Sequence, residues 1–511
     1  MVVVQTFPRV KATMNHDTKA CALPALTADF LRGSEHLIDN LFADLWKTVG
    51  MKTLLVRCGF HKRSGVAVNP ILYCLTMWVW LKSNSVSLFA RDSLRTFCAA
   101  GKDVLYEAMN REDWNWRALH LCVARKTVQQ LVVPGSLSAF VLDDTIKIRS
   151  GKKMPGISSH FDHTTGRHVM GQQVLTLGLS CSQGFVPIDS ELFTGKINVV
   201  GLPTPFKDGR SIAAVRHRTA VDQTKPQMAR DMIARAQRAG IDAQYLLADA
   251  WFGTKQMIAI AQDALLTPIV RMKNNKMKYR CTRHTPDKVV YQELDQVGLY
   301  QSAVRGQWEK IPNQNYQSKT VVVELNLNDA KGEVARWVKV RLLFVRGVCN
   351  TDKAQPGKHD WCVFLTTDTH LDAQKMLELY AMRWAIEVYF KESKQHLGFL
   401  QEQARHYACY IASIHLTAIR FCLLVIAKQQ NGVRGVAQMR QQIVINTTHI
   451  DYAARLWGCC FRTLIVNALN KLKPMLGDNV DLAMEAIDLH VQDFFAQALQ
   501  LDPLQLRLEP S

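Results

Sequence analysis

Apolar residues recur three and four positions apart from about residue 37 to residue 132. This spacing is typical of helices that each bury one face, and polar breaks separate one run from the next. The sequence therefore predicts a helical region at the start of the chain. The helical runs lie at 37–49, 69–83, 87–97 and 101–132.

The pattern changes to that of a strand where the sequence reads SAFVLDDTIKI, at 138–148. Two strands around a Ser-Gln-Gly turn are predicted next, and helices and strands then alternate. The order strand, hairpin, helix, strand, helix, strand predicts a mixed α/β layer. The later elements are the hairpin at 167–193, helices at 224–240 and 254–265, a strand that stops at Asp249 and a strand at 267–273.

Residues 273–365 carry short strand patterns separated by Asn, Asp and Gly turns, so a β-rich block is expected there. Beyond it the pattern is helical to about residue 500. Two strongly apolar segments, 71–81 and 414–427, are too short to cross a bilayer. Both are predicted to be buried helices.

The net charge of the chain adds information about its binding partner. Lys and Arg number 63 against 44 acidic residues, which gives a net charge of +19 and a pI near 9.4. Such an excess favours a polyanionic partner, usually nucleic acid, although a basic surface can also serve solubility alone. The 13 cysteines show no paired framework and no signal peptide is evident, so we expect a cytoplasmic, nucleoid-associated protein with reduced thiols.

Three acidic positions stand out from the strands and helices that carry them. Asp143 and Asp144 interrupt an apolar strand, and strand geometry puts them on opposite faces, with Asp143 beside Val141 and Thr145. Asp249 ends another apolar strand. Taken singly, an Asp at a strand end is most often a turn or helix cap.

Four polar residues lie along one edge of the helix predicted near 379–397: Tyr380, Arg383, Glu387 and Lys394. They fall within roughly a 60° arc beside the buried stripe of a continuous helix. A structural explanation is an Arg383–Glu387 ion pair one helical turn apart. A functional one is that Glu387 binds metal while Arg383, Lys394 and the Tyr380 hydroxyl bind phosphates.

Asp143, Asp249 and Glu387 together suggest a metal site. Carboxylate oxygens are the ligands that Mg²⁺ prefers, and few of them leave room for phosphate and water. Two such ions can stabilise the attacking and leaving oxygens of a phosphoryl transfer. A P-loop ATPase is disfavoured, because GxxxxGK[ST] does not occur.

The spacing Y-x2-R-x3-E-x6-K at 380–394 resembles the signature of bacterial insertion-sequence DDE transposases. The first acid of that group sits in a D-x-T strand motif, matched by Asp143 and Thr145. The second follows a strand and precedes an aromatic residue, as Asp249 does. The resemblance covers about 90–430, and the ordered combination of the motifs is more specific than any one of them.

This resemblance implies a ribonuclease-H-like catalytic core, interrupted by a β-rich insertion domain. It implies that Asp143, Asp249 and Glu387 hold two Mg²⁺ or Mn²⁺ ions, with Asp144 as the fallback for the first acid. It further implies cutting of transposon ends, joining of the freed 3′-OH to target DNA, and a homodimer on double-stranded DNA that carries terminal inverted repeats.

Two basic runs are candidate DNA contacts, with simple solvation as the alternative: KIRSGKK with Lys147, and RMKNNKMKYR with Arg271 and Lys273. Trp308 and Trp337 could stack on an extruded base, although a core position is the commoner use. Rival functions are a metal-dependent nuclease without strand transfer and a catalytically idle DNA-binding protein.

The predicted organisation has helical terminal regions around a divided core. The expected parts are a helical DNA-binding region at 1–135, the core at 136–272 and 366–430, the β-rich insertion at 273–365 and a helical C-terminal region at 431–511.

Overall fold

The computed structural model of the chain describes most residues from 40 to 499. Predictions for 1–39 and 500–511 lie outside the described residues. The internal positions that are also left out are 82, 84, 99, 152, 163–164, 274, 285–288, 305, 313, 329–333, 348–359, 457–461 and 477–478.

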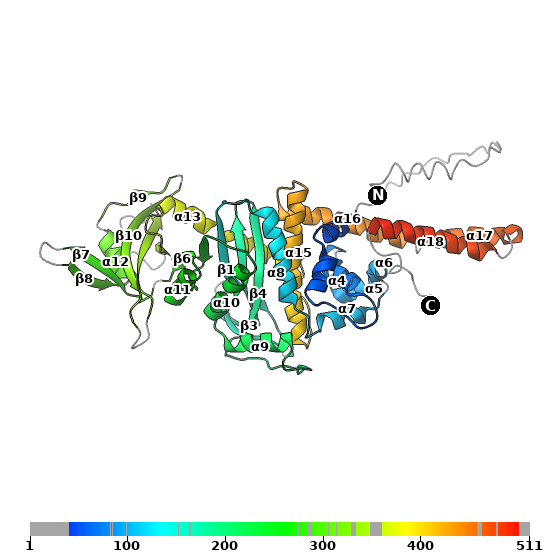
Figure 1. The fold of residues 1–511 in the computed structure, drawn as a ribbon, viewed down its shortest axis with the longest axis horizontal. Helices are drawn as coiled ribbons and strands as arrows, with labels where there is room; N and C mark the ends of the chain where they lie inside the picture. The colour runs from blue at the N-terminus through cyan, green and yellow to red at the C-terminus, as the bar shows by residue number, and fades with distance from the viewer. Residues whose placement is uncertain are drawn as a thin grey trace, which may run out of the picture. The chain divides into compact units, whose positions relative to one another are not determined.

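Helices form the first described part of the chain, as their apolar spacing predicted (Figure 1). The longest of them, α8 (Trp116–Leu131), begins at an Asn115 cap, whose side chain accepts a hydrogen bond from the amide of Ala118. The others are α2 (Leu41–Thr48), α3 (Met51–Arg57), α4 (Val68–Met77), the 3-10 helix η1 (Trp78–Leu81), α5 (Val86–Asp92), α6 (Leu94–Phe97) and α7 (Lys102–Met109).

A mixed sheet of twelve strands follows, in the order β2-β3-β1-β5-β6-β12-β11-β10-β7-β8, with β4 beside β3 and β9 beside β10. The strands β1, β5 and β6 run parallel, and the other pairings are antiparallel. The mixed α/β class is therefore confirmed. The first strands are β1 (Ser138–Ile148), β2 (Ser158–Asp162), β3 (Arg167–Cys181), β4 (Gly184–Phe193), β5 (Tyr245–Ala248) and β6 (Thr267–Met272).

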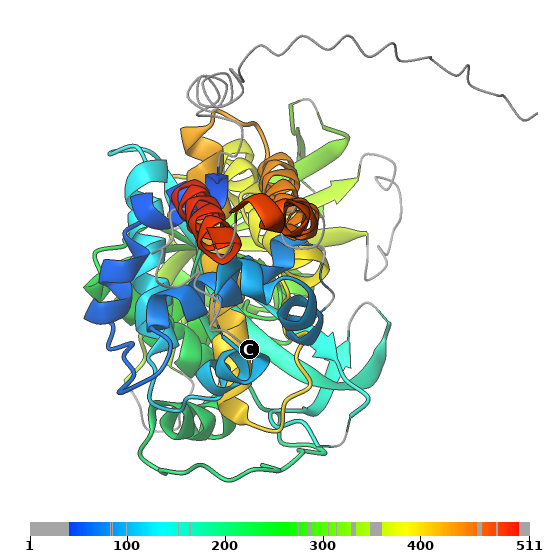
Figure 2. The same cartoon turned by 90° about the vertical axis from the view of Figure 1, so that its right-hand side faces the viewer.

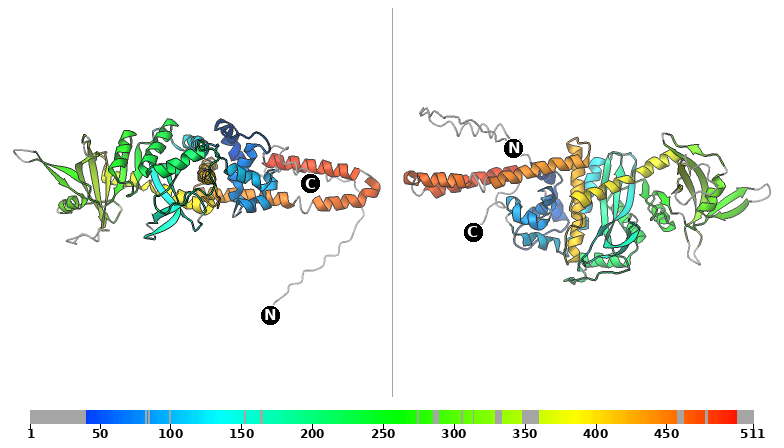
Figure 3. Two further views of the ribbon diagram at one scale, coloured as in Figure 1. Left: turned by 90° about the horizontal axis from the view of Figure 1, so that it is seen from below. Right: turned by 180° about the vertical axis from the view of Figure 1, so that it is seen from behind.

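The two faces of β1 bury different neighbours. Phe140 and Leu142 belong to the core that packs under α10 (Lys225–Arg238) and α11 (Lys255–Asp263). Because successive side chains alternate, Asp144 shares their face, whereas Asp143 lies on the other. On that second face β1 contacts α14 (Trp384–His396), as the view from behind in Figure 3 shows, and the long helix α15 (Tyr407–Gln430) packs against α14 and β4. A further helix, α9 (Ile212–Asp222), packs against β4 and α15.

The helix α15 is apolar enough to cross a membrane by length and composition, yet its whole apolar window is buried inside the fold. It packs against α8 and β4. Its buried Arg420 donates hydrogen bonds to the carbonyls of Thr76 (2.9 Å), Leu397 (2.7 Å) and Leu75. A helix that is apolar all round needs such a central position, so the prediction of a buried helix is confirmed.

The predicted β-rich block continues the sheet, because β12 (Trp361–Thr366) pairs antiparallel with β6. Three elements of this block were not predicted: β7, the short strand β9 and the helix α12 (Gln296–Val304). The remaining strands are β7 (Tyr279–His284), β8 (Val289–Leu294), β9 (Glu309–Lys310), β10 (Tyr316–Asn326) and β11 (Trp337–Gly347).

The prediction of one continuous helix through residues 379–397 was wrong. The segment divides into α13 (Ala373–Ala381) and α14 (Trp384–His396). At the junction, the amides of Met382 and Arg383 bond to carbonyls three residues back, not four. The Met382 carbonyl also accepts a hydrogen bond from Ser180 Oγ of β3 at 3.0 Å, a contact between distant parts of the chain that the local pattern could not reveal.

The helix α14 ends at His396, and Gly398, two residues further on, adopts a left-handed conformation with φ of 75°. A Cβ there would lie 3.1 Å from Trp78 and 3.2 Å from Arg420. Beyond α15 the chain is helical, as predicted, in α16 (Val436–Leu456), α17 (Arg462–Leu476) and α18 (Asn479–Leu499). The last two helices pack against each other (Figure 2).

Two buried histidines link α8 to α15. His120 Nδ1 lies 3.1 Å from His415 Nδ1, and His120 Nε2 lies 3.0 Å from the Pro187 carbonyl. Arg216 Nη1 reaches His415 Nε2 at 2.6 Å. One assignment satisfies all three contacts with neutral rings: Arg216 donates to His415, His415 donates to His120, and His120 donates to Pro187.

We expect stability to fall in mild acid because of this pair. Burial lowers the pKa of His120 to about 4 and lowers that of His415 as well. Between pH 6.5 and about 4 the unfolded chain binds more protons than the folded chain, so the free energy of unfolding decreases as pH falls. His120 alone would contribute about 3 kcal/mol to this loss.

The measurement is urea unfolding at several pH values for the wild type and His120→Gln. The wild type should lose part of its stability advantage over the variant as pH falls through this window. The exposed His370→Gln is the control and should parallel the wild type. A constant difference between wild type and His120→Gln would contradict the expectation.

Candidate active site

Two acids meet at the carboxyl ends of parallel strands. The pairing of β1 with β5 runs from Ala139 opposite Tyr245 to Leu142 opposite Ala248. The next residue on each strand is an aspartate, Asp143 and Asp249. Since both strands run the same way, the two side chains emerge at the same edge, the usual place for a site in open α/β sheets.

Asp249 is held by the turn that follows β5. Its Oδ1 accepts hydrogen bonds from the amides of Trp251 at 2.9 Å and Phe252 at 3.4 Å. The capping role that the sequence allowed for this residue is therefore present. It fixes one carboxylate oxygen, and the negative charge of Asp249 acts on the neighbouring Asp143.

The environment of Asp143 disfavours its charged form. Burial, Asp249 and Asp144 together raise the pKa of Asp143 to about 7, against the opposing effects of the Asp144 amide and Arg383. Two nearby carboxylates repel each other in a poorly solvated place, which a cation would relieve. Strongly shifted carboxyl groups of this kind are typical of functional sites.

Arg383 joins the first acid to the third. Its Nη1 lies 3.1 Å from Asp143 Oδ2, and its Nη2 lies 2.5 Å from Glu387 Oε1. The ion pair with Glu387, offered above as the structural explanation, is thus present. Arg383 also links α14 to β1. Its single guanidinium pairs with two carboxylates, Glu387 on the helix and Asp143 on the sheet, that are 244 residues apart in sequence.

Asp144 points to the other face and has different partners. Its Oδ2 lies 2.6 Å from Lys225 Nζ, and its Oδ1 accepts a 2.6 Å hydrogen bond from Gln173 Nε2. Lys225 Nζ also lies 4.3 Å from the centroid of the Trp251 ring. The structure therefore brings Asp143, and not Asp144, to the side of the sheet that carries Glu387.

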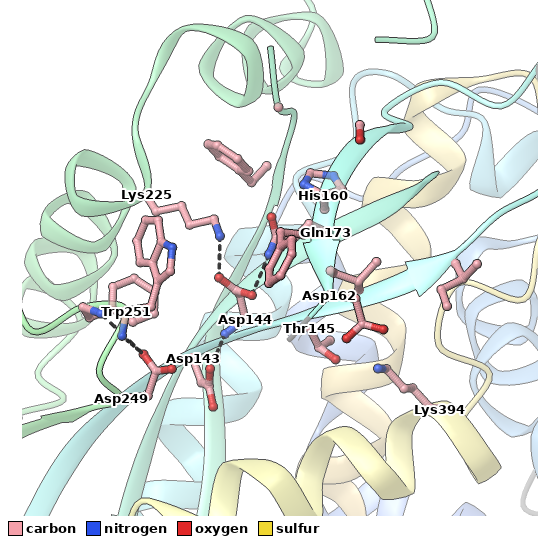
Figure 4. Close-up of a pocket in the computed structure, with 17 residues that line it drawn as sticks. Asp143, Asp144, Thr145, His160, Asp162, Gln173, Lys225, Asp249, Trp251 and Lys394 are labelled. Carbon is pink, nitrogen blue, oxygen red and sulfur yellow. Dashed lines mark hydrogen bonds and ion pairs between the residues drawn. The ribbon is translucent and has the colours of Figure 1, made fainter. Parts of the chain in front are cut away.

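A cavity of about 570 Å³ opens at this edge of the sheet and is lined by Asp143, Asp144 and Asp249 (Figure 4). Lys394 of α14 reaches it from the other side, with its amino group toward Asp162. Burial, together with the nearby Lys147, lowers the pKa of Lys394. The cavity thus has an acidic part beside a basic part, which suits a phosphate held near metal ligands.

Tyr380 and Arg271 lie beside this group. The Tyr380 ring packs against Phe364 of β12, with centroids 4.7 Å apart. Phe364 is opposite Arg271 of β6 in the sheet register. Burial raises the pKa of Tyr380, with a further contribution from Asp249, so its hydroxyl remains a neutral hydrogen-bond donor.

Lys273 lies across Trp251 from the first cavity. A second cavity of about 930 Å³ is lined there by Lys255, Lys273, Lys276 and Lys278, with Glu293 as an acid of its lining. Trp251 lines both cavities. Lysines of the basic run that begins at Arg271 therefore line the second cavity, which lies next to the cavity that the acids line.

The two tryptophans proposed for base stacking each carry an arginine. Arg280 lies 3.7 Å from the ring centroid of Trp337, and Arg346 lies 4.0 Å from that of Trp308. Trp308 also packs against the main core, whereas Trp337 lines the second cavity. A core position therefore explains Trp308, and Trp337 stays a candidate for contact with a ligand.

The acids fit a divalent cation in their chemistry but not in their present spacing. Among the described residues, no three Asp, Glu, His or Cys side chains converge closely enough to hold an ion. Asp143 and Glu387 already gather around a positive group, the guanidinium of Arg383. Asp143, Asp249 and Glu387 would therefore hold a metal if Arg383 released them.

Sequence reasoning missed several cavity residues, Lys225 foremost. Its signal was available, because Lys225 stands in the first turn of α10, where the helix dipole disfavours a cation. Such a placement indicates a nearby acid, here Asp144. Gln173 and His160 also line the cavity, and no local signal distinguishes them from other strand residues.

The fold and this edge of the sheet define an α/β protein that gathers carboxylates where parallel strands end. Residues 84–323 match a family model described as DDE superfamily endonuclease. The matched segment contains Asp143 and Asp249 and ends before Glu387. No curated protein matches the chain. The family match supports a function of the transposase or nuclease kind, with DNA as the substrate.

Proposed function

We propose that the chain is a DNA transposase of a bacterial insertion sequence, built on a ribonuclease-H-like core. The observation that carries the proposal is the placement of three acids: Asp143 and Asp249 follow neighbouring parallel strands at one edge of the sheet, and Asp143 shares Arg383 with Glu387 of the crossing helix. The matched family description points in the same direction. The antiparallel β4, β3 and β1 followed by parallel β5 and β6 suit the proposed core.

In this proposal Asp143, Asp249 and Glu387 hold two Mg²⁺ or Mn²⁺ ions. When bound, such ions would activate the attacking water and offset charge on the reacting phosphate. Asp143 is preferred to Asp144 because it shares a face with Asp249 and a partner with Glu387. Asp144 instead pairs with Lys225, which also lines the cavity.

The basic residues around the acids would position the DNA backbone. Lys147 follows Asp143 and Thr145 on the same face of β1, toward Lys394. Arg271 and Lys273 lie on the other side of Asp249, leading into the lysine-lined second cavity. Phosphates could therefore be bound on both sides of the proposed reaction centre.

The remaining parts of the proposal rest on the resemblance noted from sequence. They are recognition of terminal inverted repeats, joining of the 3′-OH to target DNA and a homodimer on DNA. The domain boundaries also stay predictions. They are those of the helical terminal regions, the β-rich insertion and the divided core. The alternative function is a metal-dependent nuclease with the same acids and no strand transfer, which the name of the matched family also accommodates.

A joining assay tests the proposal. DNA that flanks the gene, labelled at the 5′ end of the strand whose 3′-OH cleavage would free, is incubated with the protein, Mg²⁺ and a supercoiled target plasmid. We expect cleaved ends and, later, label joined to the plasmid. Cleavage without joined product would favour the nuclease alternative.

Two matched variants distinguish cleavage by this protein from cleavage by a contaminating nuclease. Glu387→Gln should give neither product, whereas Glu378→Gln, an exposed acid of α13, should behave as the wild type. Equal activity of the wild type and Glu387→Gln, or no cleavage by either, would remove the enzyme proposal.

A further inference from the structure

Arg383 occupies the place between two proposed metal ligands. Its guanidinium is within ion-pair distance of both Asp143 and Glu387, and its side chain is only 14% exposed. The other face of the group lies over the Tyr380 ring, with 5.7 Å between the guanidinium carbon and the ring centroid. A positive group held by both carboxylates competes with any second cation for the same oxygens.

The arginine is not fully satisfied in this position. Its Nε is buried and has no hydrogen-bond partner in the part of the chain that the structure describes. A buried donor without a partner costs free energy, so the arrangement is less stable than the two ion pairs alone would suggest. A ligand that accepts hydrogen bonds from the whole guanidinium fork, such as a phosphate, would satisfy more of its donors.

We propose that Arg383 is a cation gate: it holds Asp143 and Glu387 together without metal and releases them to a divalent ion when a DNA phosphate binds its guanidinium. The inference rests on the proposed function, because it takes these two acids as metal ligands. Charge balance supports the exchange. The guanidinium moves from the carboxylates to a phosphate, and a divalent ion takes its place between the carboxylates. Neither the carboxylates nor the phosphate are then left buried without a positive partner.

The gate makes metal binding and DNA binding favour each other. Metal entering first must break two ion pairs of Arg383, whereas DNA entering first draws the arginine away. Thermodynamic linkage requires the reverse effect to be equal, so metal must tighten DNA binding by the same factor. A coupling of roughly tenfold is within the usual range for such linked sites.

Titration with Mn²⁺ tests the gate without any measurement of cleavage. Free Mn²⁺ is followed by electron paramagnetic resonance with the full chain, alone and with a duplex of unrelated sequence, and binding to the duplex alone is subtracted. The wild type should bind Mn²⁺ roughly tenfold more tightly when the duplex is present. Arg383→Gln should bind it tightly without DNA and gain little from the duplex.

Two more variants keep the test decisive if Arg383→Gln does not fold. Arg383→Lys retains one charge but cannot span both carboxylates, and its Mn²⁺ affinity without DNA should lie between the other two. Arg336→Gln removes an exposed ion pair with Asp263 and should match the wild type.

The outcomes distinguish the gate from the function on which it rests. Mn²⁺ binding that Asp249→Asn weakens, but that the two Arg383 variants leave unchanged, would overturn the gate and keep the metal site. Absence of Mn²⁺ binding in every variant, with and without DNA, would overturn both.

Discussion

Asp249→Asn is expected to lower DNA cleavage by about a thousandfold or more while leaving DNA binding almost unchanged. The amide is nearly the same size and its oxygen can still accept the hydrogen bonds from the Trp251 and Phe252 amides. It lacks the negative charge that a divalent ion needs. In the proposed function, DNA binding rests instead on many Lys and Arg residues, so losing one acid should not weaken it.

The measurement pairs cleavage of labelled flanking DNA with fluorescence anisotropy on the same duplex. Asp242→Asn is the control, since it is exposed and lies just before β5, and it should retain full activity. A folded Asp249→Asn protein that cleaves normally would exclude this residue from the reaction. Loss of DNA binding in the same variant would show that its charge acts elsewhere.

Asp189→Asn is expected to destabilise the fold by about 3–5 kcal/mol. Asp189 is buried on β4, with Arg117 Nε 3.0 Å and Arg235 Nε 2.7 Å from its carboxylate oxygens. Burial alone would raise the pKa of this carboxyl, yet the nearby arginines, Arg117 first, lower it to about 2. Removing the charge leaves Arg117 with Glu191, which also pairs with Arg216, and takes from Arg235 the carboxylate that it contacts.

Urea unfolding of the two proteins at pH 7 measures the difference in free energy. Asp208→Asn, which pairs with Arg210 at the surface, is the control and should change stability by less than about 1 kcal/mol. Equal stabilities of the wild type and Asp189→Asn would mean that the arginines find water or other acceptors. Protonation of Asp189 itself would matter only in strong acid, as the pH falls from about 4 toward 2.

The strands of the site were predicted closely from the sequence. Strands are recognised by apolar residues at every second position and by turn residues at their ends, and both signals come from neighbouring residues in the chain. The bounds of β1 agree with the predicted segment, and the alternation rule alone separated Asp143 from Asp144. The end of β5 at Ala248 follows from the same kind of pattern. The proximity of the two aspartates needed one more step, since it depends on β1 and β5 being parallel neighbours.

Contacts between distant segments could not be predicted in the same way. The break between α13 and α14 accompanies a hydrogen bond from Ser180, about 200 residues earlier in the chain. The partners of Asp144 and Asp189 likewise come from other elements, Lys225 in one case and Arg117 in the other. The first-turn position of Lys225 indicates a nearby acid, but it does not identify that acid as Asp144, and no local pattern pairs Asp189 with Arg117.

The match to a family model and the sequence resemblance cover different parts of the site. The model extends over Asp143 and Asp249, whereas the spacing from Tyr380 to Lys394 includes Glu387. Arg383 connects the two parts in space. The role of Glu387 therefore depends on the structure and on experiments with variants more than on the family match.

The position of α15 also bears on how the chain is made. This helix is buried along nearly its whole length and packs against α4, α7, α8 and α9, all of which leave the ribosome long before it. The earlier helices must keep their apolar faces uncovered during translation until residues 407–430 emerge, a period in which nascent chains are prone to aggregate. A stop codon anywhere upstream of this helix would therefore yield polypeptides that lack their central packing element and are suited to degradation rather than to partial activity.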